Sequence, residues 1–239
     1  MKELEDYNWF PTVLRNFQTE FIGFVVSKFN VYGAFIEHLK SLSLPQQTMT
    51  DLCSGSGEPA SSILKKSNCF SHLVLTDKYP NDLQMKDETI SYKKESMDAM
   101  EMEFEPGTCY TMFNAFHHFK DDDKLKIIEK IQKSGSSAFF VEILEPRIIC
   151  LLKVLFATTI GTLIFTPFIK PFSLKRLFFT YILPVNIFTI TFDGIVSVLK
   201  SGSVNHYKKL FADFDDSLKV IRLTNGFTPI ILIQIQPKK

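Results

Sequence analysis

The sequence predicts an α/β fold with a seven-stranded, mostly parallel sheet, helices on both faces and an antiparallel last strand. Three observations support this prediction: short apolar runs recur along the chain, helical stretches separate several of them, and a short turn joins the last two. Strands that alternate with helices indicate parallel pairing, because each helix carries the chain back along the sheet. A short turn without a helix instead reverses the final strand.

The expected strands follow a first segment, residues 8–44, in which apolar side chains recur every three or four positions. That spacing is typical of helices with one buried face, and we expect two of them. The expected strands are residues 48–53, 72–77, 89–93, 108–115, 138–144, 218–223 and 229–236. The expected helices between them are residues 60–67, 82–86, 122–133 and 204–214, and the short turn is at 224–226.

The composition is that of a folded globular chain, with 239 residues, 22% charged and 45% hydrophobic. A net charge of +1 does not favour nucleic acid as a partner. The charge is uneven, since residues 147–200 carry six basic residues and one acid, against 21 basic and 25 acidic residues elsewhere. We therefore expect an N-terminal helical cap in residues 1–46, a sheet domain in residues 47–146 and 201–239, and an apolar helical insertion in residues 147–200.

The cysteines and the N-terminus indicate the compartment. The four cysteines are scattered over apolar positions without a metal-ligand spacing, which favours a reduced, cytoplasmic environment. The first six residues are rich in acids and do not resemble a secretory signal. The histidines also lack a ligand-like spacing to acids or thiols, so the sequence predicts no metal site.

Residues 50–60, after the first expected strand, are the strongest sign of a ligand site. Asp51 ends an apolar run, Gly55 and Gly57 alternate with serines, and Pro59 introduces a helix. Glycine is expected where the backbone needs a positive φ or approaches a ligand closely. The helix start would direct backbone amides towards an anionic group. In parallel sheets ligands bind beyond the carboxyl ends of the strands, which is where this loop lies.

Four features together resemble a known family. Asp51-x-Cys53-x-Gly55-x-Gly57 is similar to the acidic-x-Gly-x-Gly-x-Gly loop of class I S-adenosylmethionine-dependent methyltransferases, with Cys53 in place of the first glycine. Asp77 matches that family's ribose-binding acid, Asp98 matches the acid beside the adenine amino group, and residues 113–119 resemble the fourth-strand motif that borders the methyl group. The resemblance covers residues from about 49 to the end. Residues 171–200 look like the long apolar insertion after the fifth strand in a bacterial subgroup of these enzymes.

The resemblance implies a Rossmann-like fold, S-adenosyl-L-methionine as cofactor, and methyl transfer. The cofactor-binding residues that it implies are Asp51, Cys53, Ser54, Gly55, Gly57, Asp77, Lys78, Asp98, Ala99 and Asn114. The candidate catalytic residues are His117, His118 and Glu142. We favour His117 as a base or acceptor-orienting group, because imidazole titrates near neutral pH and adjacent residues of a strand point to opposite sides.

Two alternatives stay open. Gly55-x-Gly57-x-x-Ala60, with Asp77 twenty residues after Gly57, also fits the fingerprint of an NAD(P)-dependent oxidoreductase. Asp51 before the loop, Pro59 within it and the third acid at Asp98 favour the methyl donor instead. The second alternative is a non-catalytic membrane-surface binding protein with the same fold, which the departure at Cys53 allows.

The insertion predicts a small hydrophobic or lipid-like acceptor. Residues 148–169 are long enough for a membrane-spanning helix and residues 177–192 fall short. A spanning hairpin would also place Lys170, Lys175 and Arg176 on the far side, against the positive-inside preference. The helices are then a lid over the acceptor, core helices of an accessory subdomain, or a surface element with the basic turn at lipid headgroups. In the last case residues 148–199 place a cytoplasmic protein at the inner face of the membrane.

Overall fold

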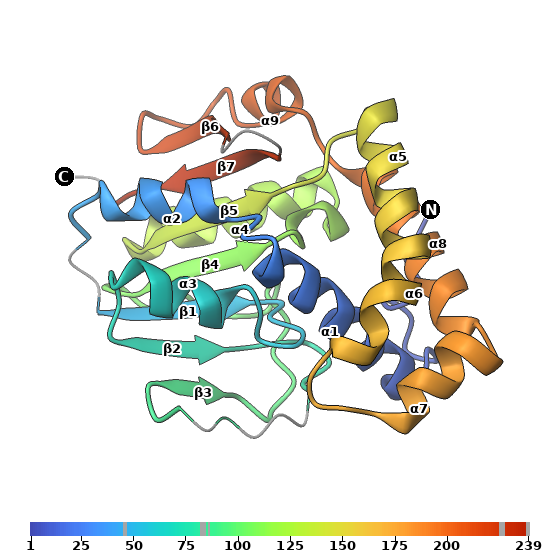
Figure 1. The fold of residues 1–239 in the computed structure, drawn as a ribbon. Helices are drawn as coiled ribbons and strands as arrows, with labels where there is room; N and C mark the ends of the chain where they lie inside the picture. The colour runs from blue at the N-terminus through green and yellow to red at the C-terminus, as the bar shows by residue number, and fades with distance from the viewer. Residues whose placement is uncertain (45–46, 82–84, 86, 225–227, 238–239) are drawn as a thin grey trace.

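The computed structural model describes residues 1–239 except 45–46, 82–84, 86, 225–227 and 238–239. Its centre is a seven-stranded sheet of order β3-β2-β1-β4-β5-β7-β6 (Figure 1). The strands are β1 Thr48–Leu52, β2 His72–Leu75, β3 Ile90–Tyr92, β4 Cys109–Phe113, β5 Ser137–Glu142, β6 Leu218–Thr224 and β7 Pro229–Ile235. All seven expected strands are confirmed, each within three residues of its expected ends.

The pairing directions also follow the sequence. Strands β1 to β5 pair in parallel, with β1 between β2 and β4. Strand β7 runs antiparallel to both of its neighbours, β5 and β6. The expected turn at 224–226 and the expected helix at 82–86 lie mostly outside the described residues.

Helices cover both faces of the sheet. On one face lie α2 Gly33–Lys40 and α3 Ala60–Ser67. The fully buried Phe35 of α2 contacts Phe113 of β4 and Phe139 of β5, and Ile63 of α3 is fully buried in the same apolar cluster. On the other face lie α4 Asp121–Ser134 and α9 Val204–Leu210, which bury Ile127 and Tyr207. Helix α1 Thr12–Lys28 instead lies at the edge formed by the carboxyl ends of the parallel strands (Figure 1). Because the helices cover both faces of the sheet with apolar side chains, polar residues gather at the edge formed by the carboxyl ends of the strands.

The insertion after β5 is helical, as expected, and stands beyond the same edge of the sheet (Figure 1). Its first part, Ile148–Phe168, is one helix of 21 residues with a mean hydropathy of 2.3, enough in length and composition to cross a membrane. Its second part, Leu174–Ile182 and Val185–Lys200 (α8), is bent by 81° at the break. Helix α8 packs against both α1 and the first insertion helix, which ties the insertion to the N-terminal helix.

The structure bears on two of the arrangements left open for the insertion. Arg176 does not lie at a headgroup-facing turn: it is 2% exposed, forms an ion pair with Glu20 of α1, and donates to the carbonyls of Ile169 and Pro171. The first insertion helix is not a core helix, since only 17% of its apolar window is buried. One stripe with a spacing of four residues is exposed to solvent, comprising Ile148, Leu152, Phe156, Ile160, Ile164 and Phe168.

Candidate functional site

A cavity of about 420 Å³ opens beyond the carboxyl ends of β1, β2 and β4, between the loop after β1 and helix α1. Its volume is in the usual range for small-molecule sites, about 300–1,000 Å³. The sequence-predicted residues that line it are Cys53, Ser54, Gly55, Asp77, Lys78, Asp98, Ala99, Asn114 and His118. Four others, Asp51, Gly57, His117 and Glu142, lie behind the lining. The structure therefore brings most of the predicted set to one space.

Two features require glycine at positions 55 and 57 of the loop: the positive backbone φ, and the lack of space for a Cβ atom. Gly55 and Gly57 have φ of +50° and +81°, which side chains disfavour. A Cβ on Gly55 would meet Thr19 of α1 at 3.0 Å, and a Cβ on Gly57 would meet Leu75 of β2 at 2.9 Å. Cys53, at the position where the resemblance implies glycine, also has a positive φ of 56°. Helix α1 is thus pressed against the loop and forms one wall of the cavity.

The start of helix α3 is already occupied by a carboxylate of the chain. The backbone N–H of Ser62 donates to Glu58 Oε2 at 3.2 Å, and the Ser27 hydroxyl donates to the same oxygen at 2.9 Å. The expectation that the helix amides point at an anionic ligand is therefore only partly met. One orphan amide of the helix is satisfied by Glu58.

Asp77, just after β2, faces the cavity with a fixed carboxylate. Its Oδ2 accepts the Gly55 N–H at 2.8 Å and its Oδ1 accepts the Tyr79 N–H at 2.8 Å. Burial raises the pKa of Asp77, although these two hydrogen bonds oppose the shift. A carboxylate has about four acceptor positions, so each oxygen can accept one more donor. This geometry suits a ligand with two neighbouring hydroxyl groups.

Asp98 and Lys78 form one rim of the cavity. The Lys78 ammonium donates to Asp98 Oδ2 at 2.8 Å, and Asp98 Oδ1 accepts the Met100 N–H at 3.0 Å. Burial opposes ionisation of Asp98, but the hydrogen bonds from Lys78 and the Met100 N–H, together with the charge of Lys78, outweigh burial and lower the pKa of Asp98. Lys78 is therefore held by Asp98, with its ammonium at the rim.

Asp51 lies at the end of β1 beneath the loop and is 2% exposed. Its Oδ1 accepts the Thr111 hydroxyl of β4 at 2.7 Å. Burial raises the pKa of Asp51 to about 7, and the charge of Asp77 adds to the shift. The side chain joins two neighbouring strands below the cavity and has no direct face on it.

The two histidines follow β4 in a turn and do not have the alternating strand geometry on which the choice of His117 was based. Strand β4 ends at Phe113, and Phe116–His118 form a 3-10 turn that turns both rings the same way, with centroids 4.6 Å apart. His118 lines the cavity, whereas His117, which we favoured, is 1% exposed behind it. The Nδ1 of His117 lies 2.7 Å from Glu142 Oε2, and Glu142 Oε1 accepts the Phe116 N–H.

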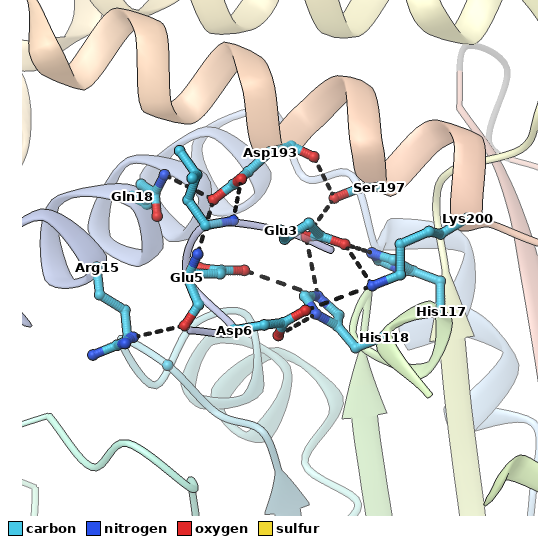
Figure 2. A network of polar contacts seen from close by, with 12 residues as sticks. Glu3, Glu5, Asp6, Arg15, Gln18, His117, His118, Asp193, Ser197 and Lys200 are labelled. Atoms are coloured by element: carbon cyan, nitrogen blue, oxygen red, sulfur yellow. Dashed lines mark hydrogen bonds and ion pairs between the residues drawn. The ribbon is translucent and has the colours of Figure 1, made fainter. Parts of the chain in front are cut away.

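The N-terminal segment was not among the predicted site residues, yet its Glu3, Glu5 and Asp6 also line the cavity. Figure 2 shows this segment between helices α1 and α8, with its acids directed at the histidines. Asp193 of α8 accepts the Leu4 N–H at 2.6 Å and the Glu5 N–H at 3.2 Å. The only signal in the sequence was the acid-rich N-terminus, which carries no local indication of its partner.

Burial and the charges of neighbouring groups shift the pKa values of Glu5, Asp6 and His118. Burial raises the pKa of Glu5 to about 8, although the charge of His118 opposes it. Burial alone would lower the pKa of His118, but Glu3, Asp6 and Glu5 outweigh it and raise that pKa to about 9. Asp6 accepts from His118 Nδ1 at 2.9 Å, and its pKa falls to about 2 despite burial. At pH 7 these shifts leave Glu5 protonated and His118 positively charged beside the Asp6 carboxylate.

Comparison with solved structures identifies the fold. The chain is similar to an O-methyltransferase family 2 protein from Planctomyces limnophilus in complex with apigenin, at 15% identity and TM-score 0.52, covering 94% of this chain and 62% of that one. It is similar to LaPhzM at 14% identity and TM-score 0.50, covering 91% and 57%. The chain has the fold of class I S-adenosylmethionine-dependent methyltransferases. The methyltransferase fold also accounts for the reversed strand β7, which the usual dinucleotide-binding order 3-2-1-4-5-6 lacks.

The similarity to known proteins is limited to the fold and to part of their length. No family model and no curated protein matches the sequence of the chain. Human N-acetylserotonin methyltransferase in complex with SAM matches at 15% identity and TM-score 0.48, over 84% of this chain and 50% of that one. The chain thus spans about half to three fifths of the length of these solved methyltransferase structures.

Proposed function

We propose that the protein is an S-adenosylmethionine-dependent methyltransferase that acts on a small hydrophobic or lipid-like acceptor. The observation that carries the proposal is the half-buried Asp77 carboxylate, which faces a cavity of about 420 Å³ at the strand ends of a methyltransferase-type sheet. Two backbone N–H groups fix its orientation and leave acceptor capacity towards the cavity. Fixed acceptors of this kind bind a diol with charge-assisted hydrogen bonds.

The other residues that line the cavity suggest where each part of the cofactor binds. We place the ribose at Asp77, the adenine beside Asp98 and Ala99, and the methionine end at the loop of Cys53, Ser54 and Gly55. Asn114 borders the sulfonium side, where β4 ends. In this arrangement Asp51 and Gly57 act from behind, by holding the loop and the neighbouring strand in place.

The acceptor end of the cavity is formed by His118, the His117–Glu142 pair behind it, and the N-terminal acids. Methyl transfer needs an in-line nucleophile held close to the sulfonium, and most of the gain in rate comes from positioning. Ser197 of α8 lines the same end, so the insertion takes part as a wall. We expect His118→Ala to reduce kcat while leaving the dissociation constant of the cofactor unchanged.

The exposed apolar stripe of the first insertion helix supports the lipid-like acceptor. Phe156 is 66% exposed and Ile164 is 53% exposed, and apolar area of this size is costly in water. We propose that this face contacts a membrane surface, at the inner face of the cytoplasmic membrane, with the exposed Lys170 and Lys175 near lipid headgroups. Flotation with anionic phospholipid vesicles tests this: the double variant Phe156→Ser/Ile164→Ser should lose most of the vesicle-bound fraction.

Isothermal titration calorimetry tests the cofactor. We expect S-adenosylmethionine to bind and NAD not to bind. Asp77→Asn should weaken binding about 10- to 100-fold, because one or two hydrogen bonds to a charged group are lost. Asp213→Asn, at an exposed position, should bind as the wild type does. Heat with NAD alone would replace the proposal with an oxidoreductase.

Activity is tested by incubating the protein with radiolabelled S-adenosylmethionine and a cell lipid extract. We expect label in the organic phase with the wild type and none with Asp77→Asn. Vesicle binding without cofactor binding or transfer would instead indicate a non-catalytic surface protein.

A further inference from the structure

Three side chains at the acceptor end bring ligand atoms together in a way that the proposed reaction does not require. One atom each from Glu3, His117 and His118 lies within 4.8 Å of the other two. Glu3 and His117 are each 1% exposed, and the side chain of His118 is 19% exposed. The group is inside the protein, at the cavity wall, and joins the N-terminal segment to the turn after β4 (Figure 2).

Each histidine is oriented by a carboxylate on its other ring nitrogen. His117 Nδ1 lies 2.7 Å from Glu142 Oε2, and His118 Nδ1 lies 2.9 Å from Asp6 Oδ1. Carboxylates accept hydrogen bonds, so both Nδ1 atoms donate. Metal-binding histidines are commonly held in this way, because the outer carboxylate fixes the ring and makes the other nitrogen a better ligand.

As a result, the outer nitrogens of both rings and the Glu3 carboxylate face one another across a small space, and an ion that binds there displaces the proton on His118 Nε2. His117 Nε2 lies 3.9 Å from Glu3 Oε1, and His118 Nε2 lies 3.4 Å from Glu3 Oε2. Within the described part of the chain, His117 Nε2 is buried and has no hydrogen-bond partner. A buried polar atom without a partner is unfavourable, and a cation placed between these atoms would satisfy all three.

The spacings suit a zinc-like ion. Ligand bonds of about 2.0–2.1 Å in a tetrahedral arrangement separate the ligand atoms by about 3.4 Å. The two spacings from the rings to Glu3, 3.9 and 3.4 Å, are to different carboxylate oxygens, and the three ligand atoms lie within 4.8 Å of one another, so the side chains draw together when an ion binds. We propose that Glu3, His117 and His118 bind a divalent transition-metal ion such as Zn²⁺.

Three protein ligands leave a fourth position open, as in catalytic zinc sites. Glu3 and His118 line the cavity, so a water or an oxygen of the acceptor can fill that position. The ion would then orient the acceptor. Metal binding is nevertheless separate from methyl transfer, because it can be measured without cofactor or acceptor.

Lys200 of α8 is the competing cation. Its ammonium lies 3.0 Å from Glu3 Oε1 and 3.6 Å from Asp6 Oδ2. Its side chain is 20% exposed, so it can move towards solvent when an ion takes its place. The Ser197 hydroxyl also donates to Glu3 Oε2 at 2.8 Å and holds that carboxylate in position.

Equilibrium dialysis and absorption with Co²⁺ test the site, using chelator-treated, full-length protein without an affinity tag. We expect one Co²⁺ per chain, displaced by Zn²⁺, with the visible absorption bands of a tetrahedral site. Glu3→Gln and His117→Gln should weaken binding by more than the about 10–100-fold that loss of an outer carboxylate costs. His72→Gln, at an exposed position on β2, is the matched control and should leave binding unchanged.

Two further variants distinguish loss of a metal ligand from general unfolding of the protein. Glu142→Gln should weaken binding about 10- to 100-fold by disturbing His117 alone. Lys200→Met should tighten binding about two- to fivefold, an effect that general unfolding cannot produce. The proposal is overturned if neither Co²⁺ nor Zn²⁺ binds at 100 µM free metal (about the level of weak, non-specific sites), or if Glu3→Gln and His117→Gln keep the same spectrum and affinity.

Discussion

The raised pKa of the buried Asp51 predicts how the stability of the fold depends on pH. Burial raises its pKa from the ordinary 3.8 to about 7, while its Oδ1 accepts the Thr111 hydroxyl. Between about pH 4 and 7 the unfolded chain has this group ionised, whereas the folded protein keeps it protonated. The contribution of Asp51 to stability therefore falls as pH rises through this window, and is constant above it.

The size of the effect follows from the shift. Each pH unit within the window costs about 1.4 kcal/mol, so the two units from pH 5 to 7 cost about 3 kcal/mol. Asn in place of Asp51 keeps an oxygen for the Thr111 hydroxyl and has no proton to lose. We expect Asp51→Asn to gain about 3 kcal/mol relative to the wild type between pH 5 and pH 8, or about 6–12 °C in Tm for a chain of this size.

Urea unfolding followed by circular dichroism at pH 5 and pH 8 measures this difference. Other titrating groups are present in both proteins and cancel in the comparison. The exposed Asp213→Asn should shift the unfolding free energy equally at both pH values. If the difference between Asp51→Asn and the wild type is the same at pH 5 and pH 8, the buried carboxyl is not the group that we describe.

Two further predictions concern packing around the site. Gly57→Ala should cost about 1–3 kcal/mol more unfolding free energy than Gly107→Ala, because both glycines have a φ near +80° but only Gly57 would clash, with Leu75; equal losses in urea unfolding would remove the packing argument. Arg176→Met should lower the unfolding free energy by about 3–5 kcal/mol, because it leaves the Glu20 carboxylate without its buried partner. The double variant with Glu20→Gln should recover part of that loss, and additive losses would contradict the pairing.

The pattern of local sequence predicted most of the fold. Helix α3 has the bounds that were expected, and each of the seven strands was found within three residues at either end. These elements depend on side-chain periodicity and turn chemistry within about ten residues, which a sequence displays directly. Asp77 and Asp98 were also expected at the cavity, because parallel strands place their carboxyl ends at one edge.

The positions of the histidines could not be predicted in the same way. We favoured His117 as the residue facing the acceptor, on the assumption that it lies in a strand. The chain instead turns at Phe116–His118, which places His118 at the cavity and His117 against Glu142. The difference between a strand end and a single 3-10 turn depends on the buried carboxylate of β5, which accepts the Phe116 N–H.

The sequence alone determined the sheet, its reversed strand, the glycine loop and the apolar character of the insertion. Tertiary structure alone decided that Arg176 is buried against α1, that Glu3 and Asp6 gather around the histidine turn, and that Asp193 holds the N-terminal segment. The physical reason is the distance along the chain over which each effect acts. Periodicity and turns depend on neighbouring residues, whereas Asp6 and His118 are 112 residues apart. They meet only because α8 and α1 hold the N-terminal segment between them.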